Sequence, residues 1–187
     1  MHIAPTALAG VLILTPRRFG DARGWFSESW NRQTLRAEGL DLPDFVQDNH
    51  SLSHRAGTIR GLHYQSPPHP QGKLVRCGRG ALTDVAVDAR RGSPTYGQWV
   101  AADLSAENGR QIWIPAGFLH GFVTREPETE VCYKCTDHYA PDCDGAVHAG
   151  SLGIDWGIDL SAATLSDKDE RAPGFADWTS PFTWEDA

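Results

Sequence analysis

Short apolar runs that end in glycine, proline, asparagine or aspartate follow one another along most of this chain. Its 187 residues include 19 glycines and 12 prolines, and turn signals such as Cys77-Gly-Arg-Gly80 and Ile114-Pro-Ala-Gly117 separate the runs. We expect strands at 10–15, 45–50, 58–65, 73–77, 81–88, 97–103, 110–114, 121–124 and 130–136. Many short strands in one compact unit are typical of a sandwich or barrel.

Helical signals are sparse. One helix is predicted at 31–38, with Asn31 as its N-cap and Gly39 as its stop. Beyond Pro141 the pattern weakens: residues 160–169 fit a short helix or an extended arm, and no structure is predicted for 178–187. The length suits one well-cored domain and is too short for two. We therefore predict a single all-β domain over 1–187, with short flanking helices and a C-terminal arm.

Charge and hydropathy exclude several classes of protein. With 17 basic and 24 acidic side chains, the chain has a net charge of −7, which argues against a general nucleic-acid binder. No window of about 18 apolar residues exists, so no membrane span is expected. The first residues lack the basic and apolar regions of a secretory signal. A local group of cations in such an acidic chain is better suited to a small anion.

The four cysteines are Cys77, Cys132, Cys135 and Cys143. The C-x-x-C spacing of Cys132 and Cys135 raises the possibility of a zinc or redox site. Both lie in a predicted strand, however, where residues three apart point to opposite faces. We therefore expect reduced thiols, as in a cytoplasmic protein, and no shared metal ion.

The segment Arg60-Gly-Leu-His-Tyr-Gln65, followed by Gln71-Gly-Lys-Leu-Val-Arg76, indicates a catalytic site. A lone histidine in a strand is usually structural, but His63 is accompanied by several cations, and a second histidine, His120, lies in a glycine-rich segment. An imidazole beside fixed cations suits a site that binds an anion and moves protons. Such a base needs a carboxylate partner. Asp84 and Asp169 are both candidates, and the residues alone leave the choice open.

A metal site is the competing use of two histidines. The chain has no His-x-His pair, and the neighbouring cations would repel a metal ion, so neither a metal nor another cofactor is predicted. Arg60 and Lys73 lie in apolar strands where an unpaired charge is costly, and a bound diphosphate would neutralise them. On a regular strand Arg60 and His63 face opposite ways. Either a bulge intervenes, or one of them serves a neighbouring subunit.

Two tyrosines are further candidates. By default Tyr133 and Tyr139 are core or interface aromatics. Alternatively, a tyrosine hydroxyl opposite a histidine could return a proton to the other face of a planar intermediate, and the second tyrosine could stack on a base.

Together these motifs resemble the dTDP-4-dehydrorhamnose 3,5-epimerase family, from about Val11 to Pro173. The resemblance rests on nine segments in order: 19–26 with Glu28, 46–51, 60–65, 71–76, 84–88, 93–99, 104–108, 114–122 and 133–137. Two segments depart from the family pattern. His138 replaces a frequent aromatic beside Tyr139, and Val147-His-Ala-Gly150 replaces a segment that commonly reads Trp-Asn-Asp, which bears on nucleotide preference more than on the type of reaction.

The resemblance implies a cupin-type β-barrel, or jelly roll, that forms a homodimer in which some contacts come from the partner chain. It implies a base at His63, its carboxylate partner at Asp169, an acid at Tyr133 and a stack of Tyr139 on thymine, while Lys73 is a candidate donor to the oxyanion. The matching nucleotide-sugar contacts are Arg23, Glu28, Gln47, Asp48, Asn49, Arg60, Lys73, His120, Asp144 and Lys168.

The implied reaction is cofactor-independent inversion of C3 and C5 in a dTDP-4-keto-6-deoxyhexose, as in dTDP-L-rhamnose biosynthesis. A relative that inverts C3 alone would use the same residues. A cupin that binds a nucleotide-sugar without turnover is another alternative, although a pure binder has no reason to keep an acid and a base together. A metal-dependent cupin oxygenase is the third.

Overall fold

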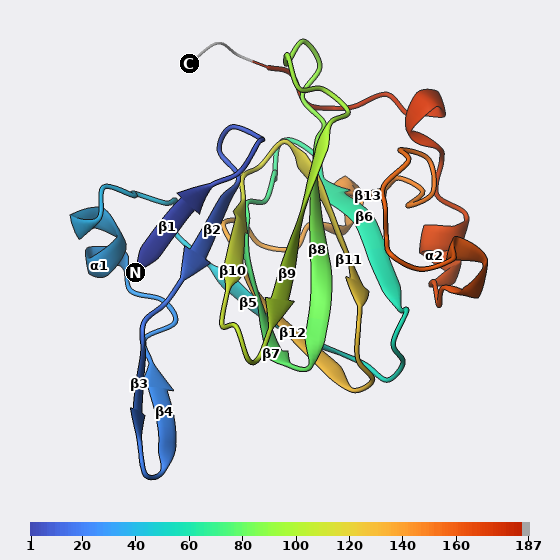
Figure 1. The fold of residues 1–187 in the computed structure, drawn as a ribbon. Coiled ribbons are helices and arrows are strands. Elements are labelled where there is room, and N and C mark those ends of the chain that lie inside the picture. Colours follow the sequence, from blue (N-terminus) through green and yellow to red (C-terminus); the bar gives the residue numbers. More distant parts are fainter. Residues whose placement is uncertain (185–187) are drawn as a thin grey trace.

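The computed structural model describes residues 1–184 and contains two antiparallel sheets and a separate hairpin (Figure 1). The six-stranded sheet has the order β1 (His2–Pro5), β2 (Leu12–Thr15), β10 (Gln111–Ile114), β7 (Lys73–Arg79), β12 (Thr129–Cys135) and β5 (Gln47–Ser53). The five-stranded sheet has the order β13 (Asp144–Ala146), β6 (Ile59–Gln65), β11 (Phe118–Thr124), β8 (Ala81–Asp88) and β9 (Trp99–Ser105). The hairpin pairs β3 (Arg18–Asp21) with β4 (Gly24–Ser27).

Alternation along β8 explains how the layers pack. Leu82 and Ala86 point into a core that both sheets line, whereas Val85 and Val87 point into a second core outside the five-stranded sheet. The chain beyond β13 covers that outer face and buries Trp156 within it. Because apolar groups meet both faces, every residue of β8 except the first is buried.

The outer face of the six-stranded sheet is covered in part by α1 (Arg32–Ala37). Asn31 caps this helix by accepting hydrogen bonds from the N–H groups of Gln33 and Thr34. Leu35 is the buried residue of α1 and packs with Trp113 of β10. Gly39 follows the helix with a φ of +84°, a conformation that favours glycine. The predicted cap and stop are therefore confirmed.

One extra residue in β6 sets which side chains enter the interior. His63 pairs with His120 of β11 and Arg60 pairs with Phe122, so Gly61 and Leu62 together oppose a single residue. This β-bulge puts Arg60 and His63 on the same side of the sheet. It confirms the first of the two explanations for their spacing. Gly61 has a φ of +127° and a cis peptide bond to Leu62.

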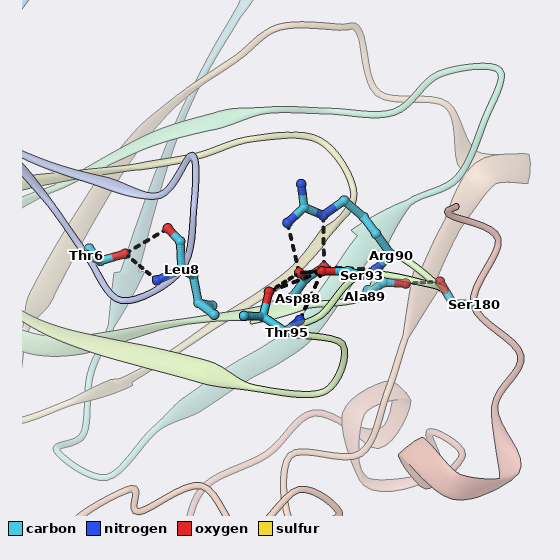
Figure 2. A network of polar contacts seen from close by, with 8 residues as sticks. All are labelled: Thr6, Leu8, Asp88, Ala89, Arg90, Ser93, Thr95 and Ser180. Atoms are coloured by element: carbon cyan, nitrogen blue, oxygen red, sulfur yellow. Dashed lines mark hydrogen bonds and ion pairs between the residues drawn. The ribbon is translucent and has the colours of Figure 1, made fainter. Parts of the chain in front are cut away.

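The C-terminal arm, defined here as residues 147–184, contains the short helices η2 (Leu160–Ala162), α2 (Asp167–Glu170) and η3 (Phe175–Asp177). Its far end is fixed at the end of β8, where the Ser180 hydroxyl donates to the carbonyl of Ala89 (Figure 2). Beside it, buried Asp88 accepts hydrogen bonds from three side chains: Arg90, Ser93 and Thr95. Burial opposes ionisation of Asp88, but these donors outweigh it and lower its pKa to about 2.

The all-β prediction is confirmed, and the fold is a jelly-roll sandwich whose sheets do not close into a complete barrel. Each of the nine predicted strands corresponds to an observed one. Three features were missed: β1, the short strand β13 after η1 (Pro141–Cys143), and the hairpin β3–β4. The 160–169 segment contains two short helices joined by extended chain. The segment 178–187, for which no structure was predicted, extends beyond the described residues. No helix within 1–184 is long and apolar enough to cross a membrane.

Substitution of Gly61 tests the bulge. A Cβ at this position would lie 2.6 Å from Gly121 Cα and 2.7 Å from the His120 carbonyl oxygen. We expect Gly61→Ala to lower the free energy of unfolding by about 3 kcal/mol or more, measured by urea denaturation. Gly24→Ala is the matched control, because Gly24 has a φ of +129° with open space around its Cβ position. Equal losses in the two variants would show that close packing at the bulge is not the cause.

Candidate active site

A polar cavity lies between the two sheets where β6 and β11 face β7 and β12. Three adjoining hollows of about 130, 280 and 110 Å³ share His63 in their walls. Arg60, Lys73, His120 and Tyr133 line the first hollow with it. Polar side chains that the sequence scatters over 74 residues therefore face one space.

His63 and Asp169 form a hydrogen-bonded pair at the edge of this cavity. The Nε2 atom of His63 lies 2.5 Å from Oδ1 of Asp169. Asp169 is buried on α2, and the N–H of Gly61 donates to its Oδ2 atom at 3.4 Å. Burial opposes ionisation of Asp169, but the hydrogen bonds, led by that of His63, lower its pKa below the usual value. An ionised carboxylate on Nε2 leaves Nδ1 of His63 available as a base.

Tyr133 faces His63 from the opposite sheet. It lies on β12 beside Asn49 of β5 and Val75 of β7, and it lines two of the three hollows that His63 lines. Burial is the main cause that raises the pKa of the Tyr133 phenol, so the hydroxyl keeps its proton at neutral pH. Lys73 shares this face, and burial lowers the pKa of its ammonium group.

The third hollow extends from His63 towards solvent. Its polar lining includes Gln47, Asn49, Tyr139 and Asp144, of which Tyr139 is exposed and donates from its hydroxyl to Asp144 at 3.4 Å. Lys168 forms an ion pair with the same carboxylate. Arg60 stands at the rim, where its guanidinium donates to the Leu52 carbonyl at 2.9 Å. Several cationic and amide groups thus surround one opening.

Three of the residues matched to the family lie elsewhere in the single chain. Arg23 is at the tip of the hairpin, 89% exposed, and pairs with Asp21. Glu28 accepts hydrogen bonds from the side chains of Asn31 and Thr34 at the start of α1. Asp48 lies on the other face of β5 from Gln47 and pairs with Lys134 at 2.7 Å. None of the three lines the hollows around His63.

His120 has its own carboxylate. Its Nε2 atom lies 2.9 Å from Oδ2 of Asp84, and both side chains are buried. The choice that the residues left open is thereby decided: Asp169 pairs with His63, and Asp84 pairs with His120. Ser51 and Phe122 also line the cavity but were not singled out in the sequence. The two-residue spacing of Gln47, Asn49 and Ser51 on one strand is the signal that could have identified Ser51.

Cys132 and Cys135 point to opposite faces of β12, as predicted for residues three apart on a strand. Asn49 donates to the sulfur of Cys135 at 3.6 Å on the cavity side of β12, whereas Cys132 lines a hollow with Asp48 and Lys134 on the other face. All four cysteines are free thiols. Within residues 1–184 no group of three or more histidine, cysteine or acidic side chains is placed to share a metal ion.

Comparisons with known proteins agree with one another. The family model described as dTDP-4-dehydrorhamnose 3,5-epimerase matches residues 5–177. The Pseudomonas aeruginosa dTDP-4-dehydrorhamnose 3,5-epimerase is 50% identical over 95% of this chain and 97% of its own length. The dTDP-6-deoxy-D-glucose-3,5-epimerase of Legionella pneumophila, solved in complex with dTDP-4-keto-L-rhamnose, superposes with a TM-score of 0.92 at 42% identity, over 100% of this chain and 99% of that one.

A more distant structure is also similar. The 3′-monoepimerase ChmJ of Streptomyces bikiniensis, solved with dTDP-quinovose, has a TM-score of 0.85 and 36% identity, over 95% of this chain and 88% of that one. Enzymes that differ in the number of inverted centres therefore share this fold.

The buried carboxylate of Asp169 predicts a pH-dependent stability. Because its pKa is lower in the folded chain than in the unfolded chain, its contribution is complete above about pH 4 and is lost as the pH falls through the folded value. We expect Asp169→Asn to cost about 2 kcal/mol of unfolding free energy at pH 7, and less at pH 3.5, by urea denaturation. Asp167→Asn on the same helix is the control, since its side chain is 89% exposed and its surface ion pair is worth little. A cost that does not shrink in acid would contradict the prediction.

Proposed function

The chain belongs to the dTDP-4-dehydrorhamnose 3,5-epimerase family and is an isomerase, and we propose that His63, Asp169, Tyr133 and Lys73 carry its chemistry. The reaction converts dTDP-4-dehydro-6-deoxy-D-glucose to dTDP-4-dehydro-L-rhamnose, in dTDP-L-rhamnose biosynthesis. One observation carries this assignment: His63 and Tyr133 approach the same cavity from opposite sheets. A base and an acid on opposite sides of a flat intermediate invert a carbon centre.

The ketone at C4 makes the protons on C3 and C5 acidic. Nδ1 of His63 removes one of these protons, and the carboxylate of Asp169 stabilises the imidazolium that forms. The electron pair of the broken C–H bond becomes the enolate, with its negative charge on the C4 oxygen. Lys73, on the cavity face of β7, donates a hydrogen bond to that oxygen. The Tyr133 hydroxyl then protonates the carbon from the other side. Proton transfers suffice, so the reaction draws on no cofactor.

The cationic rim suits the diphosphate of the nucleotide. Arg60 and Lys168 line the second hollow together with His63, and their charges favour a dianionic group there. Tyr139 is exposed beside the third hollow and offers a ring on which the thymine base can stack. Gln47, Asn49, Asp144 and His120 supply further hydrogen-bonding groups to the sugar and nucleotide. We place the reaction in the cytoplasm, where four free thiols are stable.

Inversion of C3 alone is the second candidate, favoured by the similarity to the 3′-monoepimerase. Proton NMR of the chain with dTDP-4-keto-6-deoxyglucose in D₂O separates the two. Deuterium at both C3 and C5 supports double epimerisation, whereas deuterium at C3 alone supports the single epimerase. If no deuterium is incorporated although the nucleotide-sugar still binds, the chain is a nucleotide-sugar-binding cupin without turnover.

The same experiment tests the roles of the two residues. We expect His63→Ala to abolish deuterium incorporation, by at least about 100-fold, while dTDP still binds. Tyr133→Phe should retain more exchange than inversion, because abstraction precedes the step that needs the hydroxyl. Tyr96→Phe and His54→Ala are the controls, since both side chains lie outside the cavity. Equal loss of exchange and inversion in Tyr133→Phe would refute the assigned role.

We also propose that the chain forms a homodimer through the hairpin β3–β4, which projects from the sandwich (Figure 1). Phe19 and Phe26 pair across its strands and are 51% and 70% exposed, a costly arrangement for an isolated chain. Arg23 at its tip lies outside the cavity of its own chain, as expected for a residue that reaches the partner's substrate.

Light scattering tests this assembly. The native chain should have twice its mass of 20.5 kDa, and a Phe19→Ser/Phe26→Ser double variant should be monomeric with a raised KM. Leu160→Ser removes an exposed apolar residue of the arm and should remain dimeric. A native chain that is monomeric at the concentration of the assay would overturn the proposal.

A further inference from the structure

A second histidine–carboxylate pair faces the cavity, and the mechanism above gives its carboxylate no part. His120 on β11 lies directly opposite His63 on β6. Its ring lies on the same face of β11 as Phe118 and Phe122, which belong to the core between the sheets. Asp84 comes from the next strand, β8, and is completely buried behind the imidazole. Burial of a carboxylate at such a place costs free energy, and a functional role would explain why it is there.

The hydrogen bond to Asp84 decides which nitrogen of His120 is free. Nε2 is held by Oδ2 of Asp84 at 2.9 Å, so Nδ1 is the atom left for the cavity that the ring lines. Within residues 1–184 no protein group forms a hydrogen bond with Nδ1. The arrangement repeats that of His63, whose Nε2 is also held by a carboxylate.

The surroundings of Asp84 indicate that the pair keeps an additional proton. His120 is its one hydrogen-bonding partner, and its Oδ1 atom is buried without any partner in the described chain. Burial raises the pKa of Asp84, and His120 only partly offsets this effect. The shared proton can reside on the carboxyl, with Nε2 accepting, or on the imidazolium. In both cases Nδ1 carries a hydrogen.

Other charged groups around the ring act on this proton. Arg60 and His63 face it from β6, Lys73 from β7 and the Tyr133 phenol from β12. The cations favour loss of the proton. Their effect is limited because the Arg60 guanidinium is engaged at the rim by Leu52 and Ser53, and because burial lowers the pKa of Lys73. Asp84 is hydrogen-bonded to the ring and fully buried, whereas none of these cations forms a hydrogen bond with its carboxyl in the described chain.

We propose that Asp84 is a positioning residue that keeps Nδ1 of His120 protonated, as a second hydrogen-bond donor to the C4 oxygen of the substrate beside Lys73. This inference rests on the proposed function. C4 lies between the two carbons whose protons His63 removes, so its oxygen falls within reach of the side chain next to His63. The hydrogen bond strengthens as the oxygen becomes negative, and the proton stays on nitrogen throughout.

Nitrogen NMR of the native chain with ¹⁵N-labelled histidine tests the protonation directly. The resonances of His120 are those that disappear in His120→Gln. We expect Nδ1 of His120 to carry a proton at pH 7. An unprotonated Nδ1, with the proton on Nε2 alone, would make the ring an acceptor and overturn the proposal, whatever the activity of any variant.

Kinetics of Asp84→Leu test the consequence, because leucine is close to aspartate in size and can neither donate to Nε2 of His120 nor accept from it. We expect kcat for deuterium exchange to fall by about 100-fold, with KM within about threefold of the native value and the dissociation constant of dTDP unchanged. Asp88→Leu is the matched control: it removes another buried carboxylate of β8, outside the cavity, and should keep its kcat at temperatures where it is folded.

The outcomes separate this inference from the proposed function. Exchange in the native chain that Asp84→Leu leaves intact would refute the role of Asp84 alone. A parallel loss of kcat and dTDP affinity would show that Asp84 is merely structural. Absence of exchange in the native chain would refute the proposed function together with this inference. If Asp84→Leu does not fold, the NMR of the native chain still decides.

Discussion

The pairing of β6 with β11, interrupted by one bulge, is the constraint on which the rest of the site depends. Without the extra residue at Gly61, the side chains of Arg60 and His63 would point to opposite faces of the sheet. With it, both side chains point to the same face, Arg60 at the rim of the cavity, and His63 comes to lie opposite His120. The close approach of Gly61 to Gly121 permits no side chain at the bulge. A single backbone irregularity therefore brings together His63, a rim cation and a second imidazole.

The C-terminal arm completes the site from outside the sandwich. It covers the second apolar core with residues such as Trp156, and this burial holds it against β6 and β11. The carbonyl of Thr164 accepts from the N–H of Ile59, which fixes the arm beside β6 just before α2 delivers Asp169. The hydrogen bond from the Ser180 hydroxyl to the carbonyl of Ala89, beside the network around Asp88, anchors its far end (Figure 2). Packing that resembles ordinary core formation thus places the carboxylate of Asp169 beside His63.

Two aspartates bonded to histidines differ because their surroundings differ. Asp169 accepts from His63 and from a backbone N–H, and its pKa is lowered in spite of burial. Asp84 accepts from His120 alone, leaves one oxygen unpaired, and has a raised pKa. The same pair of residue types therefore stands in two different electrostatic settings, which push the pKa values of the two carboxyls apart. In the proposed reaction, the first pair removes protons and the second stabilises the anion.

The sequence by itself determined the all-β class, the helix at Asn31, nine of the strands and the grouping of His63 with Arg60, Lys73 and His120. These follow from local rules: turn residues, caps, alternation and the chemistry of an imidazole beside cations. The residue patterns left both Asp169 and Asp84 as partners of His63, and the family resemblance implied Asp169. Only the tertiary structure shows the pairing itself, because residues 106 positions apart meet through arm packing rather than through any local pattern. It likewise decided that Arg60 shares the face of His63 and that Arg23 lies outside the cavity of its own chain. Register, bulges and docking depend on contacts between distant segments, which the local pattern of a sequence does not record.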